Sequence, residues 1–197
     1  MRVIRPTCLR RSEAPASRRQ VAAVLLPALL WGLAAQAEAR QWKPEPQDQA
    51  VEYAQIIDRR SETETVVVMW LAPEILEKTT ESRTIRSVLK IYAIIGIGHA
   101  SASPAGKVEF TVPKGVLVET GEDQVRQPLD QETLPPTVSA TISSLGELLA
   151  QGMGAMGQGM VWFVFDGKGL ESCREGGFRV VYADEAYDYE TPIPGCE

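Results

Sequence analysis

The chain has 197 residues, with 20 basic and 26 acidic side chains and a formal net charge of −6. If residues 1–37 are removed, the remainder carries 14 basic and 25 acidic groups, a net charge near −11. So acidic a surface is repelled by nucleic acid and by anionic lipid, which argues against both as partners. The 160 remaining residues suffice for one domain that buries about 68–70% of its unfolded surface.

The first 37 residues have the pattern of a signal peptide. Six arginines lie in residues 1–19, and Val21–Ala35 then runs for 15 residues without a charge. Alanines at small-x-small spacing allow cleavage after Ala37 or Ala39. This run is too short to cross ~30 Å of hydrocarbon, and no later run reaches the ~18 apolar residues of a membrane span. We therefore expect a periplasmic or secreted protein with no stable span after cleavage, exported by general secretion or by the twin-arginine route.

The mature chain is predicted to begin with a flexible tail, residues 38–49, followed by a single β-rich domain over 50–197. Apolar residues at helical spacing predict a first helix near 48–59, and Pro73 opens a second near 73–82. Between them, the β-branched residues 63–71 predict a buried strand.

Residues 88–99 predict the longest strand, and apolar side chains on both of its faces indicate a central position in a sheet. Val108–Val112 and Val116–Glu119 flank Pro113-Lys114-Gly115, which favours a hairpin. Thr137 can cap a helix over 137–154. Its apolar stripe consists of Val138, Ile142, Leu145, Leu149, Met153 and Met156. A strand over 160–165 follows.

The C-terminal segment predicts a second hairpin, with Phe178–Tyr182 paired to Tyr187–Thr191 around Asp184-Glu185. If opposed residue numbers sum to 369, aromatic and β-branched side chains share one face. Cys173 and Cys196 also sum to 369, and an oxidising compartment favours their pairing. We therefore expect a Cys173–Cys196 disulfide, which stabilises the fold by roughly 3 kcal/mol on the chain-entropy model.

Two groups of side chains could bind a metal or act in catalysis. The thioethers of Met153, Met156 and Met160 suit Cu(I), although a methionine stripe at helical spacing is usually core packing. His99, the only histidine, could join them, or it could serve Ser101 or Ser103 as a base in a small hydrolase. A single histidine in a strand-end loop has no such role by default, so we expect no catalytic residue and no cofactor.

Three further patterns resemble functional motifs but are better explained by their structural context. Gly152, Gly154 and Gly157 match the dinucleotide-binding glycine pattern, but a helix precedes them and a strand follows, the reverse of what the mechanism needs. Ser87 and Lys90 match the Ser-x-x-Lys of penicillin-binding enzymes without the companion motifs of those enzymes. The acidic residues between 184 and 190 fit no calcium loop and are typical of the solvated face and turn of a hairpin.

The pattern of elements favours a mainly β fold with peripheral helices, a β-sandwich for which an immunoglobulin-like arrangement is one option. The alternative is an α+β fold with one sheet packed on the long helix. The leading functional hypothesis is an exported, non-catalytic protein that binds another envelope protein or a small ligand. Tyr182, Tyr187 and Tyr189 are candidates for its interface. A Cu(I)-handling protein and a small exported hydrolase are the alternatives.

Overall fold

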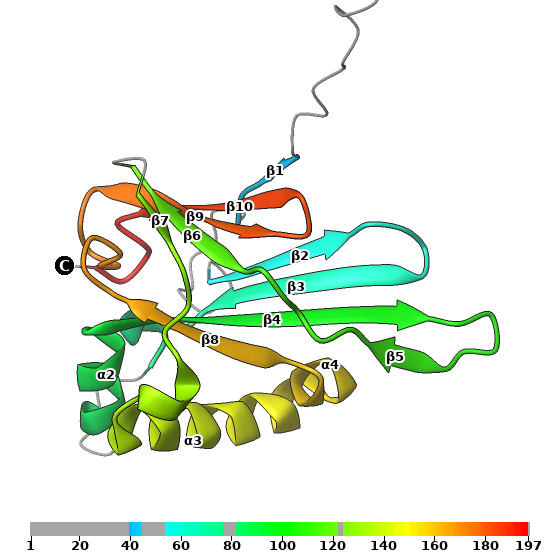
Figure 1. Ribbon diagram of the computed structural model, residues 1–197, viewed down its shortest axis with the longest axis horizontal. Helices are drawn as coiled ribbons and strands as arrows, with labels where there is room; N and C mark the ends of the chain where they lie inside the picture. Colours follow the sequence, from blue (N-terminus) through cyan, green and yellow to red (C-terminus); the bar gives the residue numbers. More distant parts are fainter. Residues whose placement is uncertain (1–39, 45–53, 77–81, 122–123, 197) are drawn as a thin grey trace, which may run out of the picture. The chain divides into compact units, whose positions relative to one another are not determined.

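The computed structural model describes residues 40–44, 54–76, 82–121 and 124–196, all within one unit that spans Ala39–Glu197. The predicted signal peptide and most of the predicted tail lie outside the described residues. The described part is mostly β, with two five-stranded sheets and few helices (Figure 1).

The strands of the first sheet, sheet A, are, in order, β1 (Gln41–Trp42), β10 (Glu185–Thr191), β9 (Gly176–Tyr182), β6 (Leu117–Thr120) and β7 (Val125–Arg126). Those of sheet B are β2 (Gln55–Arg59), β3 (Glu64–Trp70), β4 (Tyr92–Ala102) and β5 (Val108–Phe110), with β8 (Val161–Asp166) also paired to β4. The helices are η1 (Pro73–Ile75), α2 (Arg83–Leu89), η2 (Gln131–Thr133), α3 (Pro136–Met153) and α4 (Ala155–Gln158).

One hydrophobic core draws on both sheets. Alternate residues of β4, namely Ala93, Ile95 and Ile97, turn to the same side as Trp70 of β3 and pack with Phe178 and other residues of sheet A. The rings of Trp70 and Phe178 meet edge to face, with centroids 4.8 Å apart, a preferred arrangement for aromatic pairs. This shared core joins the two sheets.

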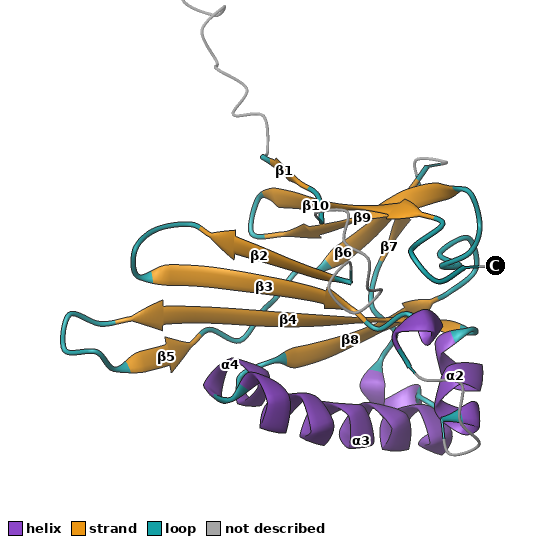
Figure 2. Cartoon of the chain, turned by 180° about the vertical axis from the view of Figure 1, so that it is seen from behind, coloured by secondary structure: helices purple, strands orange, loops and turns teal. Residues whose placement is uncertain are grey.

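The opposite face of sheet B packs against helices. Figures 1 and 2 show α3 running beside β8 and β4 on the side away from sheet A. Val138 and Leu145 of α3 are buried there with Ile94 of β4 and Val164 of β8. The apolar stripe predicted for residues 137–154 is thus confirmed, as are apolar faces on both sides of β4 and a strand near 160–165. Residues 63–71 also form the expected strand.

The predicted helix near 48–59 is wrong over its described part, because Gln55–Arg59 form strand β2, paired antiparallel with β3. Burial there alternates with a period of two. Ile56 and Asp58 are buried and Ile57 is exposed, so the helical spacing of Ala54 and Ile57 is coincidental.

Three other predicted elements differ from the structure. In the helix predicted near 73–82, residues 73–75 form a short 3₁₀ turn, and residues 77–81 lie outside the described residues. Helix α2 takes in Ser87, Val88 and Leu89, so β4 begins four residues later than predicted, at Tyr92. The expected hairpin of 108–119 is also wrong. Strand β5 pairs with β4 in sheet B, whereas β6 pairs with β7 and β9 in sheet A, so the chain crosses between sheets around Gly115.

The C-terminal hairpin forms, but its register is two residues from the predicted one. Tyr189 faces Phe178, Tyr187 faces Val180 and Arg179 faces Asp188, so opposed numbers sum to 367. The turn consists of Ala183 and Asp184, whose φ angles of 50° and 63° fit a two-residue hairpin turn despite the absence of glycine. A slip of two residues leaves every side chain on its predicted face.

Residues 40–44 belong to the segment predicted as a flexible tail, yet Gln41 and Trp42 form β1, parallel to β10. The backbone N–H of Ala186 donates to the carbonyl of Arg40 at 3.2 Å. At least this part of the predicted tail is therefore paired with sheet A.

Candidate functional site

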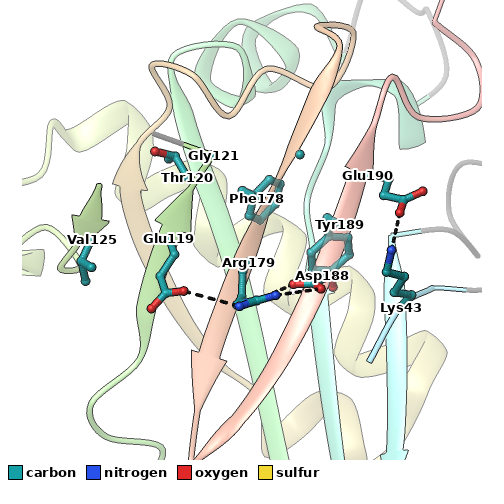
Figure 3. Close-up of a pocket in the computed structure, with 11 residues that line it drawn as sticks. Lys43, Glu119, Thr120, Gly121, Val125, Phe178, Arg179, Asp188, Tyr189 and Glu190 are labelled. Atoms are coloured by element: carbon teal, nitrogen blue, oxygen red, sulfur yellow. Dashed lines mark hydrogen bonds and ion pairs between the residues drawn. The ribbon is translucent and has the colours of Figure 1, made fainter. Parts of the chain in front are cut away.

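A row of charged side chains crosses the face of sheet A that points away from the shared core. The Arg179 guanidinium on β9 donates to both carboxylate oxygens of Asp188 on β10, at 2.6 and 3.1 Å. On its other side, Glu119 of β6 lies 3.9 Å from Arg179 (Figure 3). The hydrogen bonds with Asp188, together with both negative charges, raise the pKa of Arg179 above its ordinary value. Arg179 is thereby held in a fixed position.

This row forms part of a cavity of about 480 Å³, within the range of small-ligand sites. Figure 3 shows Lys43 and Glu190 paired at the end formed by β1 and β10, and Val125 at the opposite end. Two glycines, Gly121 and Gly177, are among the residues that line this cavity. A Cβ atom placed on Gly121 would meet nothing within 4 Å.

A second cavity, of about 460 Å³, adjoins the first and shares four lining residues with it. These are Thr120, Gly121, Gly177 and Phe178. We call the two cavities together the sheet A groove. Its far end is basic: Arg126, Lys168 and Arg174 line it, together with Glu171 and Glu175.

The basic end already holds a carboxylate. Glu171 accepts a hydrogen bond from the backbone N–H of Gly169 at 3.0 Å, and Arg174 lies 3.8 Å from its other oxygen. The Gly169 hydrogen bond, with the charges of Arg174 and Arg126, lowers the pKa of Glu171. The geometry of this end therefore suits a carboxylate or another small anion.

His99 lies in a different cluster, at the junction of the two sheets. Its Nδ1 is 2.7 Å from the Tyr182 hydroxyl of sheet A, and its Nε2 is 2.8 Å from Oε1 of Glu64 on β3. Both ring nitrogens are thus occupied, and neither partner is Ser101 or Ser103. The alternative of a hydrolase, in which His99 acts as base for Ser101 or Ser103, therefore does not match these contacts.

A buried ion pair lies beside this cluster. Asp58 is fully buried, and its Oδ2 accepts hydrogen bonds from Arg60 Nε at 3.1 Å and from the Tyr187 hydroxyl at 3.0 Å. Arg60 also donates to Tyr187 at 2.9 Å. Burial opposes the charge of Arg60, but Tyr187 and Asp58 outweigh it and raise the pKa of Arg60. The network joins β2 to β10 and so ties the sheets together.

The chain Glu64–His99–Tyr182 could in principle move a proton between solvent and the buried phenol. Burial, however, raises the pKa of Tyr182, and that of Tyr187 as well, so both phenols stay protonated near neutral pH. A protonated phenol with its hydroxyl engaged is a poor nucleophile. The arrangement is that of a structural bridge.

The structure separates His99 from the methionines. His99 lies on the face of β4 that meets sheet A, whereas Met156 and Met160 pack over Gly98 and Gly96 on the opposite face. Met153 packs in the same helical core. A Cu(I) site that combines His99 with these thioethers is therefore excluded, and the methionines fill space that the two glycines leave.

Tyr182, Tyr187 and Tyr189 are only 4%, 0% and 1% exposed, respectively. The proposed tyrosine interface is therefore wrong, because the face that these residues share is the inner face of sheet A. The acidic residues nearby have cationic partners: Glu185 pairs with Arg40, and Asp188 with Arg179.

Cys173 and Cys196 are at disulfide-bonding distance, with Cα atoms 5.3 Å apart. The pairing expected from the sequence is therefore present, although the strand register from which it was inferred is not. The glycine pattern at 152–157 marks the end of a helix, as expected. Gly154 has a φ of 58° between α3 and α4, and Gly157 allows α4 to lie close to the backbone of α3.

Sequence reasoning missed the groove residues Arg126, Arg174 and Arg179. Arg126 lies far from Arg174 and Arg179 in the chain, and the three follow no motif. The only local signal was the glycine pair at 176–177, which leaves the start of β9 without side chains.

Fold and site together define a mainly β protein with two five-stranded sheets and an open, charged groove on one of them. Comparison with protein-family models, with curated proteins and with solved structures finds no match for this chain. No helix in the described part of the chain combines the length and the apolar character that a membrane span requires.

Proposed function

We propose that this protein is an exported, non-catalytic binding module whose ligand lies in the sheet A groove. The supporting observation is the groove itself: two adjoining cavities of about 480 and 460 Å³, with an anchored arginine in one and a basic end in the other. The arginine-rich leader and the disulfide support export, since disulfides persist in oxidising compartments.

We also propose that the two sheets form a sandwich with helices on one outer face, so that both architectures expected from the sequence are combined. The support is the core shared by Trp70 and Ile95 of sheet B with Val180 and Tyr189 of sheet A. This arrangement leaves the outer face of sheet A for the ligand.

The proposed ligand is a short peptide or small molecule that carries a carboxylate. Its carboxylate would take the position of Glu171, near Arg126, Arg174 and the N–H of Gly169. Glu171 itself is exposed, so its side chain can turn into solvent when it is displaced. The rest of the ligand would lie across Gly121 towards Arg179.

Calorimetric titration tests this with peptides that end in a free carboxylate and with the same peptides ending in an amide. A charge-assisted hydrogen bond contributes about 1.5–3 kcal/mol, so we expect the free carboxylates to bind more tightly by about tenfold or more. Equal binding of both forms would contradict the proposed ligand class.

Gly121→Trp tests the location, because it adds a large side chain in open space between the cavities. The matched control is Gly152→Trp on exposed α3, where an added Cβ also meets nothing within 4 Å. We expect Gly121→Trp to abolish peptide binding and Gly152→Trp to leave it unchanged. If both variants bind as the unaltered chain does, the ligand does not lie in the groove.

The Cu(I) and hydrolase hypotheses have weaker support. A copper site would have to use core methionines without His99, and a hydrolase would have to free His99 from Tyr182 and Glu64. The binding module is therefore the function that we propose.

A further inference from the structure

Three strong metal-binding side chains meet close to the basic end of the sheet A groove. Ligand atoms of Glu74, Cys173 and Cys196 all lie within 4.8 Å of one another. Glu74 belongs to η1, Cys173 to the connection between β8 and β9, and Cys196 to the segment after β10. Figure 1 shows the last two segments side by side near the C-terminus. Three separate parts of the chain thus converge here.

The Glu74 carboxylate is poorly satisfied while the cysteines are joined. Its Oε2 is buried and accepts no hydrogen bond from any described residue. Its Oε1 lies 3.5 Å from Sγ of Cys173, a sulfur that carries no hydrogen in a disulfide. A buried acceptor without a donor is unusual and calls for an explanation, such as an ion that completes it.

We propose that reduction of the Cys173–Cys196 disulfide turns this cluster into a zinc site. Zn–S bonds of about 2.3 Å and Zn–O bonds of about 2.0–2.2 Å in a tetrahedron put sulfur and oxygen about 3.5 Å apart. That is the separation between Glu74 Oε1 and Cys173 Sγ. The two sulfurs have to move apart to about 3.8 Å, and a water molecule takes the fourth position.

The charges of the opened cluster favour a divalent cation. Two thiolates and a carboxylate this close together repel one another, and either protons or a metal ion must neutralise them. Two thiolates with one oxygen ligand match the preference of Zn²⁺ for sulfur-containing tetrahedral sites.

The site is also accessible. Cys173 is exposed, and an adjoining cavity of about 370 Å³ is lined by both Glu74 and Cys173. These provide a route for the reductant and for the metal ion.

The chemistry balances with a phosphine as reductant. The phosphine gives two electrons to the sulfur–sulfur bond and takes up the oxygen of a water molecule to become the phosphine oxide. The two protons of that water are transferred to the two sulfurs, so both cysteines become thiols. Binding of Zn²⁺ then forms two metal–sulfur bonds and releases both thiol protons.

The experiment uses Co²⁺, whose thiolate charge-transfer absorption reports sulfur ligation, followed by displacement with Zn²⁺. We expect the reduced chain to bind one Co²⁺ and the oxidised chain to bind none. We expect Glu74→Gln to weaken Co²⁺ binding by at least about tenfold, a loss at the low end for a ligand-shell residue. The matched control, Glu175→Gln, removes an exposed carboxylate two residues from Cys173 and should bind as the unaltered chain does.

Thermal denaturation of the reduced chain with and without Zn²⁺ distinguishes metal binding by the folded chain from metal binding by unfolded chains. We expect Zn²⁺ to raise the melting temperature, because only the folded chain brings Glu74 to the cysteines. Equal Co²⁺ binding by oxidised and reduced chains, equal binding by Glu74→Gln and the unaltered chain, or no stabilisation by Zn²⁺ would each overturn the proposal. None of these results bears on peptide binding in the groove, which is measured on the oxidised chain.

Discussion

Replacing Tyr187 by phenylalanine tests whether the buried ion pair stabilises the junction of the sheets. The substitution removes a hydroxyl that accepts from Arg60 at 2.9 Å and donates to Asp58 at 3.0 Å. Asp58 is fully buried, and its Oδ1 has no hydrogen-bond partner among the described residues. Without Tyr187, its carboxylate keeps only the contact with Arg60 Nε.

The expected magnitude follows from the charges involved. A hydrogen bond to a charged group contributes about 1.5–3 kcal/mol, and this substitution removes two, with partial recovery by water at the slightly exposed Arg60. We therefore expect Tyr187→Phe to lower the free energy of unfolding by about 2–4 kcal/mol. Tyr189→Phe is the matched control. Its hydroxyl is equally buried but donates to the neutral carbonyls of Ala54 and Val68, at 3.3 and 3.1 Å, so we expect a loss of about 1 kcal/mol.

Denaturant unfolding with linear extrapolation measures both free energies, and equal slopes would show that the same surface is exposed in each case. In thermal unfolding, each 1 kcal/mol corresponds to roughly 2–4 °C for a domain of this size. If Tyr187→Phe costs no more than Tyr189→Phe, the Asp58–Arg60–Tyr187 network does not stabilise the fold, and our assignment of its role is wrong.

Three further predictions concern other parts of the fold. Replacing Cys173 and Cys196 together by serine should lower the unfolding free energy by about 3 kcal/mol, since the disulfide joins residues 23 apart; unchanged chemical denaturation would contradict this. Gly157→Ala should destabilise the chain, because the added Cβ would lie 2.6 Å from a backbone oxygen of α3. Gly152→Ala, where the added Cβ meets nothing within 4 Å, should stabilise the chain by up to about 1 kcal/mol. Thermal unfolding measures both changes, and the opposite order of stabilities would refute the close helix contact. The pKa of Glu171 is lowered in the folded chain, so its contribution to stability is present above about pH 4.5 and is lost as pH falls through the lower, folded value. The stability difference from Glu171→Gln should therefore shrink in acid, and a difference independent of pH would contradict the interaction with Gly169.

Elements whose burial follows one simple period could be predicted from the sequence. Helix α3 carries its apolar residues at steps of three and four, and β4 is apolar on both faces. Strand β2 was misread because the residue that completes its buried face is Asp58, a charge that only the distant Arg60 and Tyr187 make tolerable in the core. No local sequence pattern shows that a buried carboxylate has charged or hydrogen-bonding partners elsewhere in the chain.

The register of the C-terminal hairpin shows a second limit. Registers that differ by two residues place the same side chains on the same face, so the aromatic pattern cannot distinguish them. The difference depends on Ala183 and Asp184, both with positive φ, where the sequence offers neither glycine nor asparagine. The disulfide could still be predicted, because Cys173 and Cys196 are the two cysteines that follow the predicted signal peptide.

The candidate site was the least predictable part. Arg126 and Arg174 meet only because β7 and the segment before β9 come together at one end of sheet A. The sequence instead predicted an interface formed by Tyr182, Tyr187 and Tyr189. An exposed aromatic face and a buried aromatic face of a hairpin have the same residue spacing, so the sequence could not distinguish them.

The parallel pairing of β1 with β10 has a consequence for how the chain matures. Gln41 precedes its partner Ala186 by 145 residues in the chain. The β1 edge of sheet A therefore cannot form until the residues of β10 have also been synthesised. Closing so long a loop is entropically costly, so we expect the pairing of β1 with β10 to form late and slowly during folding.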